Sequence, residues 1–366
     1  MEEIRRPCGR SRRPVVKVGS GVLSGGSGRL DLKVMRRLAR ELAVLKAEGR
    51  EPLLVSSGAI LAGRERLKLK AQPATTQLKQ AAAAVGQSRL MRAWEQAFGR
   101  EGLVVAQILL TRDDLRSRQR YLNARNTIFT LLRMGVVPII NENDTVAVEE
   151  IKFGDNDVLS ALVASLSGAD MLVLLTDQDG LYDVDPRSDP RASLIPVVEE
   201  GRAQARLGRA GPMGAGGMES KVRAARMAAC AGIPAVIANG FTAGALRDAL
   251  EGRPIGTLFV PRVSPLDKRR QWLAFASQPK GSIHVDEGAR EALARGEKLA
   301  AAEAQIREWE ARAKKAEAVL VETRKIPSHI CVICGGMGTE EKPDVSGFIQ
   351  AVQCTLLAAQ AEEENG

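Results

Sequence analysis

Residues 141–157 read NENDTVAVEEIKFGDND and gather six carboxylates and three side-chain amides in one short stretch. They follow directly on the apolar run at 136–140, which has the composition of a buried strand. Carboxylates in such a place can bind a metal, accept a proton, or hold a positively charged ligand. The residues of this stretch leave these three alternatives open.

Four further loops combine glycine with lysine, serine or aspartate. They are KVGSG at 17–21, SSGA at 56–59, TDQDG at 176–180 and GAGGMESK at 214–221. Glycine lets the backbone come close to a ligand and offers its N–H groups to an anion. A helix N-terminus adds about half a positive charge. Several such loops at successive strand ends therefore predict a phosphate-binding site.

The residue types around these loops favour phosphoryl transfer. The chain has neither the G-x-x-x-x-G-K-[ST] loop of P-loop enzymes nor the G-x-G-x-x-G turn of Rossmann dehydrogenases. Its two histidines, His284 and His329, both lie beyond the α/β region, which disfavours a Ser-His-Asp hydrolase. Lysines, glycine amides and aspartates remain, and phosphoryl transfer depends mainly on positioning and charge stabilisation.

The elements that must position these loops alternate along the chain. Continuous Val, Ile and Leu runs predict buried strands at 15–18, 52–55, 103–110, 136–140, 171–175, 234–238 and 257–260. Helical patterns lie between them at 31–48, 76–98, 114–134, 156–167 and 219–231. This order predicts an α/β fold, a three-layer α/β/α sandwich with a mostly parallel central sheet. In such sheets ligands bind at the carboxyl ends of the strands.

Length and composition are those of a globular protein with one large domain and a smaller part. The chain has 366 residues, of which 45% are hydrophobic. No stretch approaches the ~20 apolar residues that span a bilayer. The basic N-terminus lacks the apolar segment of a secretory signal. Five scattered cysteines favour a reducing cytoplasm over a disulfide framework.

The net charge of +9 is spread along helical stretches such as 33–50 and 112–133, without interleaved aromatic residues. We interpret these charges as solvated helix faces and not as an RNA-binding surface. The basic residues 1–13 are expected to form a flexible N-terminal extension.

Nine motifs carry a resemblance to a known family. They are VVKVGSGVLSGG, VSSGAI, AAAAVGQSRLM, QILLTRDDL, YLNARNT, VPIINENDTVA, FGDNDVLSALVA, LLTDQDGLYDVDPR and GAGGMESK. With these motifs in family order, residues 14–262 resemble the glutamate 5-kinases, of the amino acid kinase family. The resemblance implies the amino acid kinase fold and ATP-dependent phosphorylation of the γ-carboxylate of L-glutamate, the first step of proline biosynthesis. It also implies Mg²⁺ held by ATP without a dedicated protein metal site, inhibition by proline, and a homo-oligomer, either a dimer or a tetramer.

The resemblance assigns the acidic stretch to the substrate amino acid. Asp144 and Asn156 match the positions that hold the amino acid, and Asp155 supports their loop. Ser57 lies at a predicted helix start, where its hydroxyl and nearby amides can hold a carboxylate. The acidic stretch is then a clamp for the α-ammonium group of glutamate.

The same resemblance assigns the phosphate loops. Lys17 and Lys221 are expected to neutralise the transferring phosphoryl group, and Asp157 to keep both lysines in place. Gly19 and Gly21 would line the phosphate path. The remaining nucleotide-binding positions are Thr176, Asp177, Ala215, Gly216, Gly217, Met218, Glu219 and Ser220, together with Lys17 and Lys221. The family usually has threonine at the position of Ala215.

The C-terminal third departs from the family. Residues 268–296 resemble the start of a PUA domain, a small β-barrel, but the likeness stops there. Residues 297–366 begin with a predicted helix and form a divergent, helical or irregular tail. We therefore expect a small, incomplete PUA-like β region, and we infer no RNA binding from it. The single Cys331-x-x-Cys334 pair is interpreted as incidental thiols.

Two alternatives remain beside the glutamate 5-kinase interpretation. One is another amino acid kinase, acting on acetylglutamate, carbamate or a uridylate. The acidic stretch disfavours it, because those substrates lack a free α-ammonium. The other is a regulatory protein that binds glutamate or proline and has weak catalysis.

Overall fold

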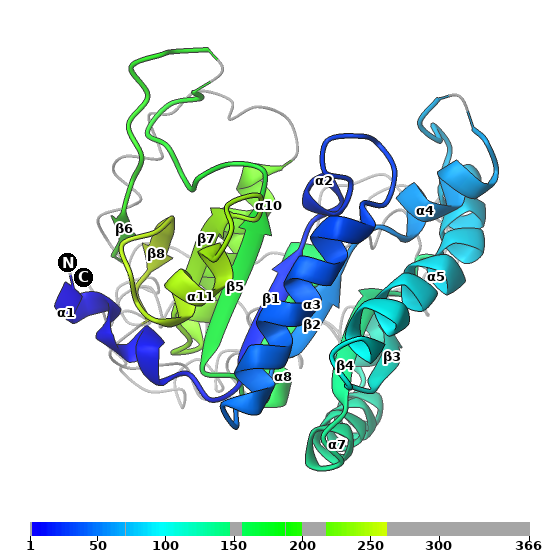
Figure 1. Ribbon diagram of the computed structural model, residues 1–366, viewed down its shortest axis with the longest axis horizontal. Coiled ribbons are helices and arrows are strands. Elements are labelled where there is room, and N and C mark those ends of the chain that lie inside the picture. The colour runs from blue at the N-terminus through cyan, green and yellow to red at the C-terminus, as the bar shows by residue number, and fades with distance from the viewer. Residues whose placement is uncertain (1, 70, 147–155, 187, 200–216, 262–366) are drawn as a thin grey trace, which may run out of the picture. The chain divides into compact units, whose positions relative to one another are not determined.

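A computed structural model describes residues 2–69, 71–146, 156–186, 188–199 and 217–261. In this part of the chain one sheet contains eight strands in the order β3-β4-β2-β1-β5-β7-β8-β6 (Figure 1). Their bounds are Pro14–Val18 (β1), Leu53–Ser56 (β2), Val105–Leu110 (β3), Val137–Glu142 (β4), Met171–Thr176 (β5), Val197–Val198 (β6), Ala235–Asn239 (β7) and Thr257–Phe259 (β8). All seven predicted strands are present, and the short β6 is the one that the apolar runs did not predict.

The sheet is parallel except where β7 pairs antiparallel with β8. In the centre Val18, the last residue of β1, pairs with Ser56 on one side and with Leu175 on the other. The carboxyl ends of β1, β2, β4 and β5 therefore lie along one edge. This confirms the prediction of a mostly parallel sheet and brings the loops after these strands together.

Helices cover both faces of the sheet, as predicted for a three-layer sandwich (Figure 1). One layer contains α3 (Leu32–Ala47), α5 (Thr76–Gly99) and α11 (Ala245–Leu250); the other contains α7 (Arg118–Arg133), α8 (Asn156–Ser167) and α10 (Met218–Cys230). Side chains alternate across β1. Val16 and Val18 join the apolar core under α3 and α5, so Val15 and Lys17 point to the opposite layer.

Two glycines bring α4 (Ala59–Arg66) into backbone contact with α5. A Cβ added at Gly63 would lie 1.7 Å from the carbonyl oxygen of Ala82, and one added at Gly86 would lie 1.8 Å from that of Ala59. No larger residue fits at either position without moving a helix. Because α4 starts just after β2, this contact sets the distance between α5 and the end of β2.

The helix predicted at 114–134 is two helices in the structure, α6 (Arg112–Arg116) and α7. Thr111 and Asp114 form a capping box that starts α6, and Ser117 is extended with ψ 116°. The T-x-x-D pattern of TRDDL is the signal for this early start.

The N-terminus differs from the expected flexible extension. Glu2–Arg5 forms α1, and Arg6–Arg10 forms a 3₁₀ helix, η1. Arg5 is only 1% exposed, and its guanidinium donates hydrogen bonds to the carbonyl oxygens of Pro196, Arg253, Ile255 and Gly256. These bonds to its two terminal nitrogens compensate much of the cost of burying the charge, and they attach this segment to the β6–β8 edge.

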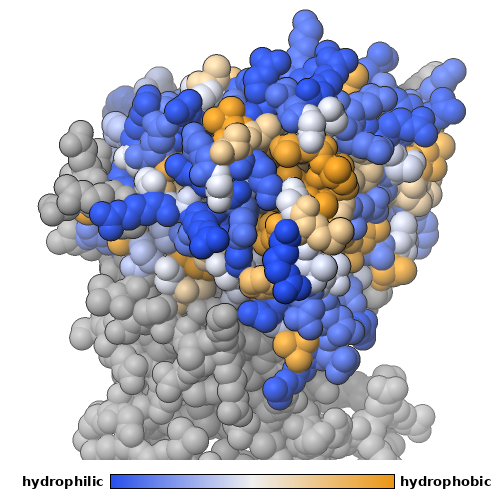
Figure 2. Space-filling view, turned by 60° about the horizontal axis from the view of Figure 1, so that its bottom comes forward, coloured by the Kyte–Doolittle hydropathy of each residue, from blue (hydrophilic) through white to orange (hydrophobic). Residues whose placement is uncertain are grey.

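Figure 2 shows one face of the described residues, where hydrophilic side chains cover most of the surface and hydrophobic ones occupy smaller areas. No helix among the described residues is long and apolar enough to cross a membrane. The incomplete PUA-like region at 268–296 and the divergent tail at 297–366 lie outside the described residues.

Candidate active site

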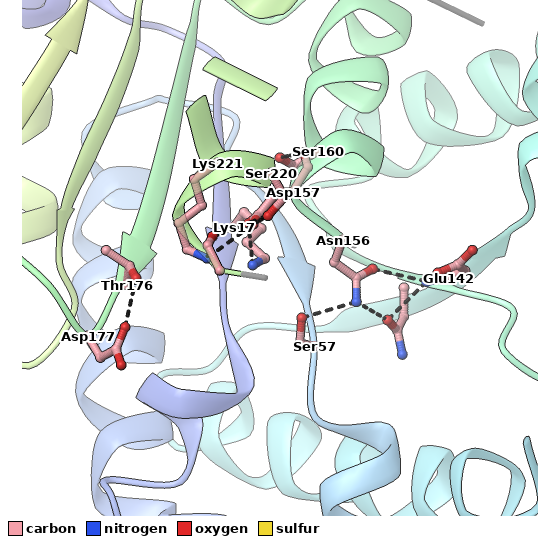
Figure 3. A network of polar contacts seen from close by, with 12 residues as sticks. Lys17, Ser57, Glu142, Asn156, Asp157, Ser160, Thr176, Asp177, Ser220 and Lys221 are labelled. Atoms are coloured by element: carbon pink, nitrogen blue, oxygen red, sulfur yellow. Dashed lines mark hydrogen bonds and ion pairs between the residues drawn. The ribbon is translucent and has the colours of Figure 1, made fainter. Parts of the chain in front are cut away.

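Two lysines share one buried carboxylate at the carboxyl edge of the sheet (Figure 3). Asp157, in the first turn of α8, forms an ion pair with Lys17 of β1 through Oδ1 and with Lys221 of α10 through Oδ2, the latter at 3.2 Å. Ser220 also donates a hydrogen bond to Oδ2 at 2.9 Å. We call Lys17, Asp157 and Lys221 the lysine–aspartate cluster.

The charges of the lysine–aspartate cluster are almost completely removed from water. The side chain of Asp157 is 0% exposed, that of Lys17 4% and that of Lys221 12%. Two ammonium groups face one carboxylate, and the N-termini of α8 and α10 add partial positive charge. This surplus of positive charge, with helix N–H groups close by, suits a phosphate group.

Glycines keep the space beside the lysine–aspartate cluster open. A Cβ added at Gly19 would lie 3.6 Å from Nζ of Lys17, and one added at Gly21 would lie 4.0 Å from the carboxyl carbon of Asp177. At these distances an added methyl group would be in ordinary van der Waals contact with Lys17 or Asp177, and a longer side chain would take up space beside them. Gly19 follows Val18, the last residue of β1, and precedes the short helix α2 (Ser20–Leu23).

The end of β5 forms a separate polar group on one side of the cluster. Thr176 donates a hydrogen bond from Oγ1 to Oδ1 of Asp177 at 3.0 Å. The neighbouring loop after β7 is attached here, because Gly240 donates its N–H to the carbonyl of Thr176 at 2.7 Å. Figure 3 shows Thr176 and Asp177 on the opposite side of Lys17 from Ser57 and Asn156.

Neutral side chains form the other side of the site, near the ends of β2 and β4. Oε1 of Gln87 accepts a hydrogen bond from Nδ2 of Asn141 at 2.8 Å. Oδ1 of Asn141 accepts one from Nδ2 of Asn156 at 2.9 Å, and the same Nδ2 donates to Oγ of Ser57 at 3.1 Å. We call Gln87, Asn141, Asn156 and Ser57 the amide network. It joins α5, β4, α8 and the turn after β2.

The turn that presents Ser57 depends on glycine. Ser57 donates its backbone N–H to the carbonyl of Val18 at 3.1 Å, which holds it beside the end of β1. Gly58 follows with φ +108°, a conformation that a side chain would strain, and turns the chain into α4.

Asp144 lies just beyond β4, in the wall of a pocket of ≈ 320 Å³ that also contains residues of α5 and β3. Burial raises the pKa of its carboxyl to about 6. Gln87 and Gln107 line the same pocket, so Asp144 and the amide network border one cavity. A carboxylate in this place can pair with a cationic group of a small ligand.

The structure brings together most of the predicted site residues that it describes. Lys17, Asp157, Ser220 and Lys221 are in contact, as are Ser57 and Asn156. Gly217 precedes α10 and accepts a hydrogen bond from Lys221 at 2.7 Å, whereas Met218 and Glu219 occupy the first turn. Asp155, Ala215 and Gly216 lie outside the described residues.

Three polar residues of the site were missed by the sequence analysis: Gln87, Asn141 and Glu142. Asn141 and Glu142 begin the acidic stretch and are buried at the end of β4. Gln87 follows AAAAVG on α5. The sequence feature that could have indicated a role for it is a single amide after a run of alanines and a glycine. Among the described residues no group of three or more His, Cys, Asp or Glu could hold a metal ion.

Comparisons with known proteins identify the family of this chain. Residues 12–239 match the model of the amino acid kinase family. A glutamate 5-kinase of Pelobacter propionicus is 51% identical over 285 residues, which cover 77% of this chain and 76% of that protein. A glutamate 5-kinase of Geobacter metallireducens is 52% identical over 289 residues, covering 78% and 77% respectively. Among solved structures, a UMP kinase from Bacillus anthracis has a TM-score of 0.48 and 16% identity, covering 68% of this chain and 96% of that chain.

Proposed function

This chain belongs to the glutamate 5-kinases of the amino acid kinase family, and we propose how its site divides the reaction among its residues. The reaction is ATP-dependent phosphorylation of the γ-carboxylate of L-glutamate, the first step of proline biosynthesis. The order of groups along the sheet edge carries the proposal. The lysine–aspartate cluster lies between the polar group at the end of β5 and the amide network.

The reaction requires positive charge to stabilise the transferring phosphoryl group, and it does not require a general base. At neutral pH the γ-carboxylate of glutamate is already ionised, because carboxyl groups of this kind have a pKa near ~4.3. One of its oxygens forms a bond to the γ-phosphorus of ATP as the bond between that phosphorus and the β,γ-bridging oxygen breaks. The electron pair of the broken bond leaves with ADP. No proton has to be removed.

The two lysines then stabilise the charge of the transferring group. Lys17 approaches it from the glutamate side, and Lys221 approaches it from the nucleotide side. Asp157 acts as a positioning residue, because it holds both ammonium groups in fixed places and offsets part of their repulsion. Gly19 and Gly21 leave room for the phosphates, and the positions at Thr176, Asp177 and 215–221 hold the nucleotide.

The amide network and Asp144 recognise glutamate. Asp144 pairs with the α-ammonium, while Asn156 and Ser57 hold the amino acid by hydrogen bonds. Asp155 supports this loop. The pocket beside α5 supports the assignment, because Asp144 and Gln87, a member of the amide network, line it together.

Mg²⁺ belongs to the nucleotide in this proposal. The carboxylate nearest the phosphates, Asp157, is occupied by two lysines, and no described cluster of three or more ligating residues offers a protein cage. Oxygens of the ATP phosphates fit the preference of Mg²⁺ for oxygen ligands and retained waters. When bound, the ion supplies further positive charge to the β- and γ-phosphates.

Three further properties belong to the proposal. Proline, a smaller amino acid, inhibits by competing for the glutamate positions. The enzyme forms a homo-oligomer and works in the cytoplasm. The five cysteines are scattered along the sequence without the spacing of a disulfide framework, which supports a reducing compartment.

The test is a glutamate-dependent hydroxamate assay. The full chain is incubated with ATP, Mg²⁺, L-glutamate and hydroxylamine, which traps the acyl phosphate. Lys221→Ala should lower kcat by about 10²–10³, because it removes a charge that is aimed at the transition state. Lys33→Ala, which changes an exposed lysine of α3, is the matched control and should retain full activity.

Two outcomes would contradict the proposal. A folded wild-type chain that binds ATP but forms no hydroxamate would favour a regulatory protein that binds glutamate or proline. Equal or better turnover of N-acetylglutamate would show that the acidic residues do not select the free α-ammonium, and it would favour another amino acid kinase.

A further inference from the structure

Gln87 occupies an unusual position for a buried amide. Its Oε1 accepts the hydrogen bond of Asn141, but within the described part of the chain its Nε2 is buried and has no hydrogen-bond partner. An unpaired buried NH₂ group is destabilising. Among the described residues only the oxygen of this amide has a hydrogen-bond partner, so the role of Gln87 depends on what that oxygen does.

The main chain fixes the orientation of the amide network. The backbone N–H of Glu142 faces both amide oxygens, Oδ1 of Asn141 at 2.9 Å and Oδ1 of Asn156 at 3.2 Å. A backbone N–H can only donate, so both side chains must present oxygen to it and NH₂ on their other side. The NH₂ of Asn141 then points at Gln87. Because Asn141 is only 2% exposed, no bulk water replaces Gln87 as its acceptor.

The same orientation decides what the hydroxyl of Ser57 can do. Nδ2 of Asn156 is a donor, so Oγ of Ser57 must accept from it. The hydroxyl hydrogen of Ser57 is then left to point into the site. If the amide of Asn156 turned over, its oxygen would face Ser57 and would take that hydrogen. The hydroxyl would no longer be available to an incoming carboxylate.

We propose that Gln87 is a positioning residue for the substrate amino acid. By accepting the hydrogen bond of Asn141, it holds the amide network in the orientation in which Ser57 donates to a carboxylate group of glutamate. The inference rests on the proposed function of the site. It also gives a role to the close α4–α5 packing, since Gly86 brings α5 against the first turn of α4, just after Ser57.

The first experiment measures a kinetic difference between the two substrates. Gln87→Met keeps the length of the side chain and removes its oxygen. We expect the KM for glutamate to rise about tenfold, as for the loss of one buried hydrogen bond, with kcat and the KM for ATP nearly unchanged. Gln96→Met is the matched control, because Gln96 is an exposed residue of the same helix and lies outside both the pocket and the amide network. It should leave all three constants unchanged.

The second experiment tests whether Gln87 acts through Ser57. The Ser57→Ala variant and the Gln87→Met/Ser57→Ala double variant are compared in the same assay. We expect the double variant to have the same KM for glutamate as Ser57→Ala alone, because the hydroxyl that Gln87 orients is gone. Urea unfolding of each variant checks the fold, and Gln87→Ala replaces Gln87→Met if that variant does not fold.

Two results would overturn the inference. One is an unchanged KM for glutamate in Gln87→Met. The other is a penalty that adds fully to that of Ser57→Ala, which would show that Gln87 supports the pocket by another route. In both cases the wild-type chain still forms the hydroxamate, whereas failure of the proposed function would abolish the product in the wild type.

Discussion

The two sides of the site hold their ligands by different physical means. The lysine–aspartate cluster is built from full charges that are almost completely removed from water. The amide network is neutral, and each of its hydrogen bonds has a direction that a backbone N–H determines. Of the two predicted substrate-binding carboxylates, Asp144 and Asp155, the structure describes Asp144. Asp144 lies beside the amide network and is half-buried.

This difference follows from the ligands. A triphosphate spreads several negative charges over many oxygens, so positive charge at fixed places is what stabilises it. An amino acid is small and carries both signs of charge, so it is held by groups whose donors and acceptors point the right way. The two sides should therefore fail differently when they are altered.

Loss of charge in the lysine–aspartate cluster should have the largest effect. Asp157→Asn leaves two buried lysines beside two helix N-termini with no carboxylate between them. We expect kcat to fall by about 10²–10³. The free energy of unfolding should fall by about 3–5 kcal/mol, as when one partner of a buried ion pair is removed. The hydroxamate assay and urea unfolding measure the two losses.

An exposed ion pair provides the control for this variant. Asp189 pairs with Arg191 at 3.1 Å on the surface. Asp189→Asn should change neither activity nor stability appreciably, because surface pairs contribute little. Wild-type activity in Asp157→Asn would show that the lysines keep their positions without the carboxylate. It would contradict the inference that the lysine–aspartate cluster depends on its buried charges.

An intermediate effect is expected from widening the α4–α5 contact. Gly86→Ala places a Cβ 1.8 Å from the carbonyl oxygen of Ala59, so the two helices must separate. We expect a loss of about 1–3 kcal/mol in the free energy of unfolding. The KM for glutamate should rise while the KM for ATP stays nearly constant, because Gln87 moves with α5 and the lysine–aspartate cluster does not.

Gly99, the last residue of the same helix, is the matched control. A Cβ added there meets no atom within 4 Å. Gly99→Ala should stabilise the protein by up to about 1 kcal/mol, because alanine is the better helix former. If Gly86→Ala raised both KM values equally, the two sides of the site would not be separable as we describe them.

The smallest effect concerns pH and the glutamate side. The pKa of Asp144 is raised to about 6 by burial, so its carboxylate takes up a proton as the pH falls through that value. The protonated form no longer attracts the α-ammonium. We expect kcat/KM for glutamate to fall about tenfold between pH 7 and pH 5, as the ionised fraction of such a group does.

Asp144→Asn should lower kcat/KM for glutamate at pH 7 and remove this part of its pH dependence. If the variant shows the same fall between pH 7 and pH 5 as the wild type, another group causes it. The α-ammonium clamp would then have to be assigned to a different carboxylate of the acidic stretch.

The sequence predicts the fold well because parallel strands are buried on both faces. Continuous apolar runs located seven strands, and the two-residue β6 was too short to form such a run. Lys17 is recognisable in the sequence because it is the charged residue of the otherwise apolar run VVKVG, which forms a buried strand. The capping box at Thr111 marks the start of α6 before the predicted helix at 114–134, but it does not indicate the break at Ser117.

Contacts between distant residues could not be predicted in this way. Gln87 and Asn141 are 54 positions apart, and their hydrogen bond depends on how closely α5 packs against the sheet. Arg5 lies 191 to 251 positions from its acceptors, so its basic segment resembled a solvated tail in the sequence. No local sequence pattern indicates the hydrogen-bond partners of Gln87 or of Arg5. The family resemblance located the substrate loops but not these supporting residues.

The burial of Arg5 also has a consequence for how the chain folds during synthesis. The acceptors of its guanidinium are at 196 and at 253–256, so Arg5 cannot make all of these bonds until more than two hundred further residues have been made. Domains generally fold as units, and contacts between distant parts of the chain form slowly. The segment around Arg5 is therefore made well before its partners and is among the last to reach its place, beside β8, as the domain closes.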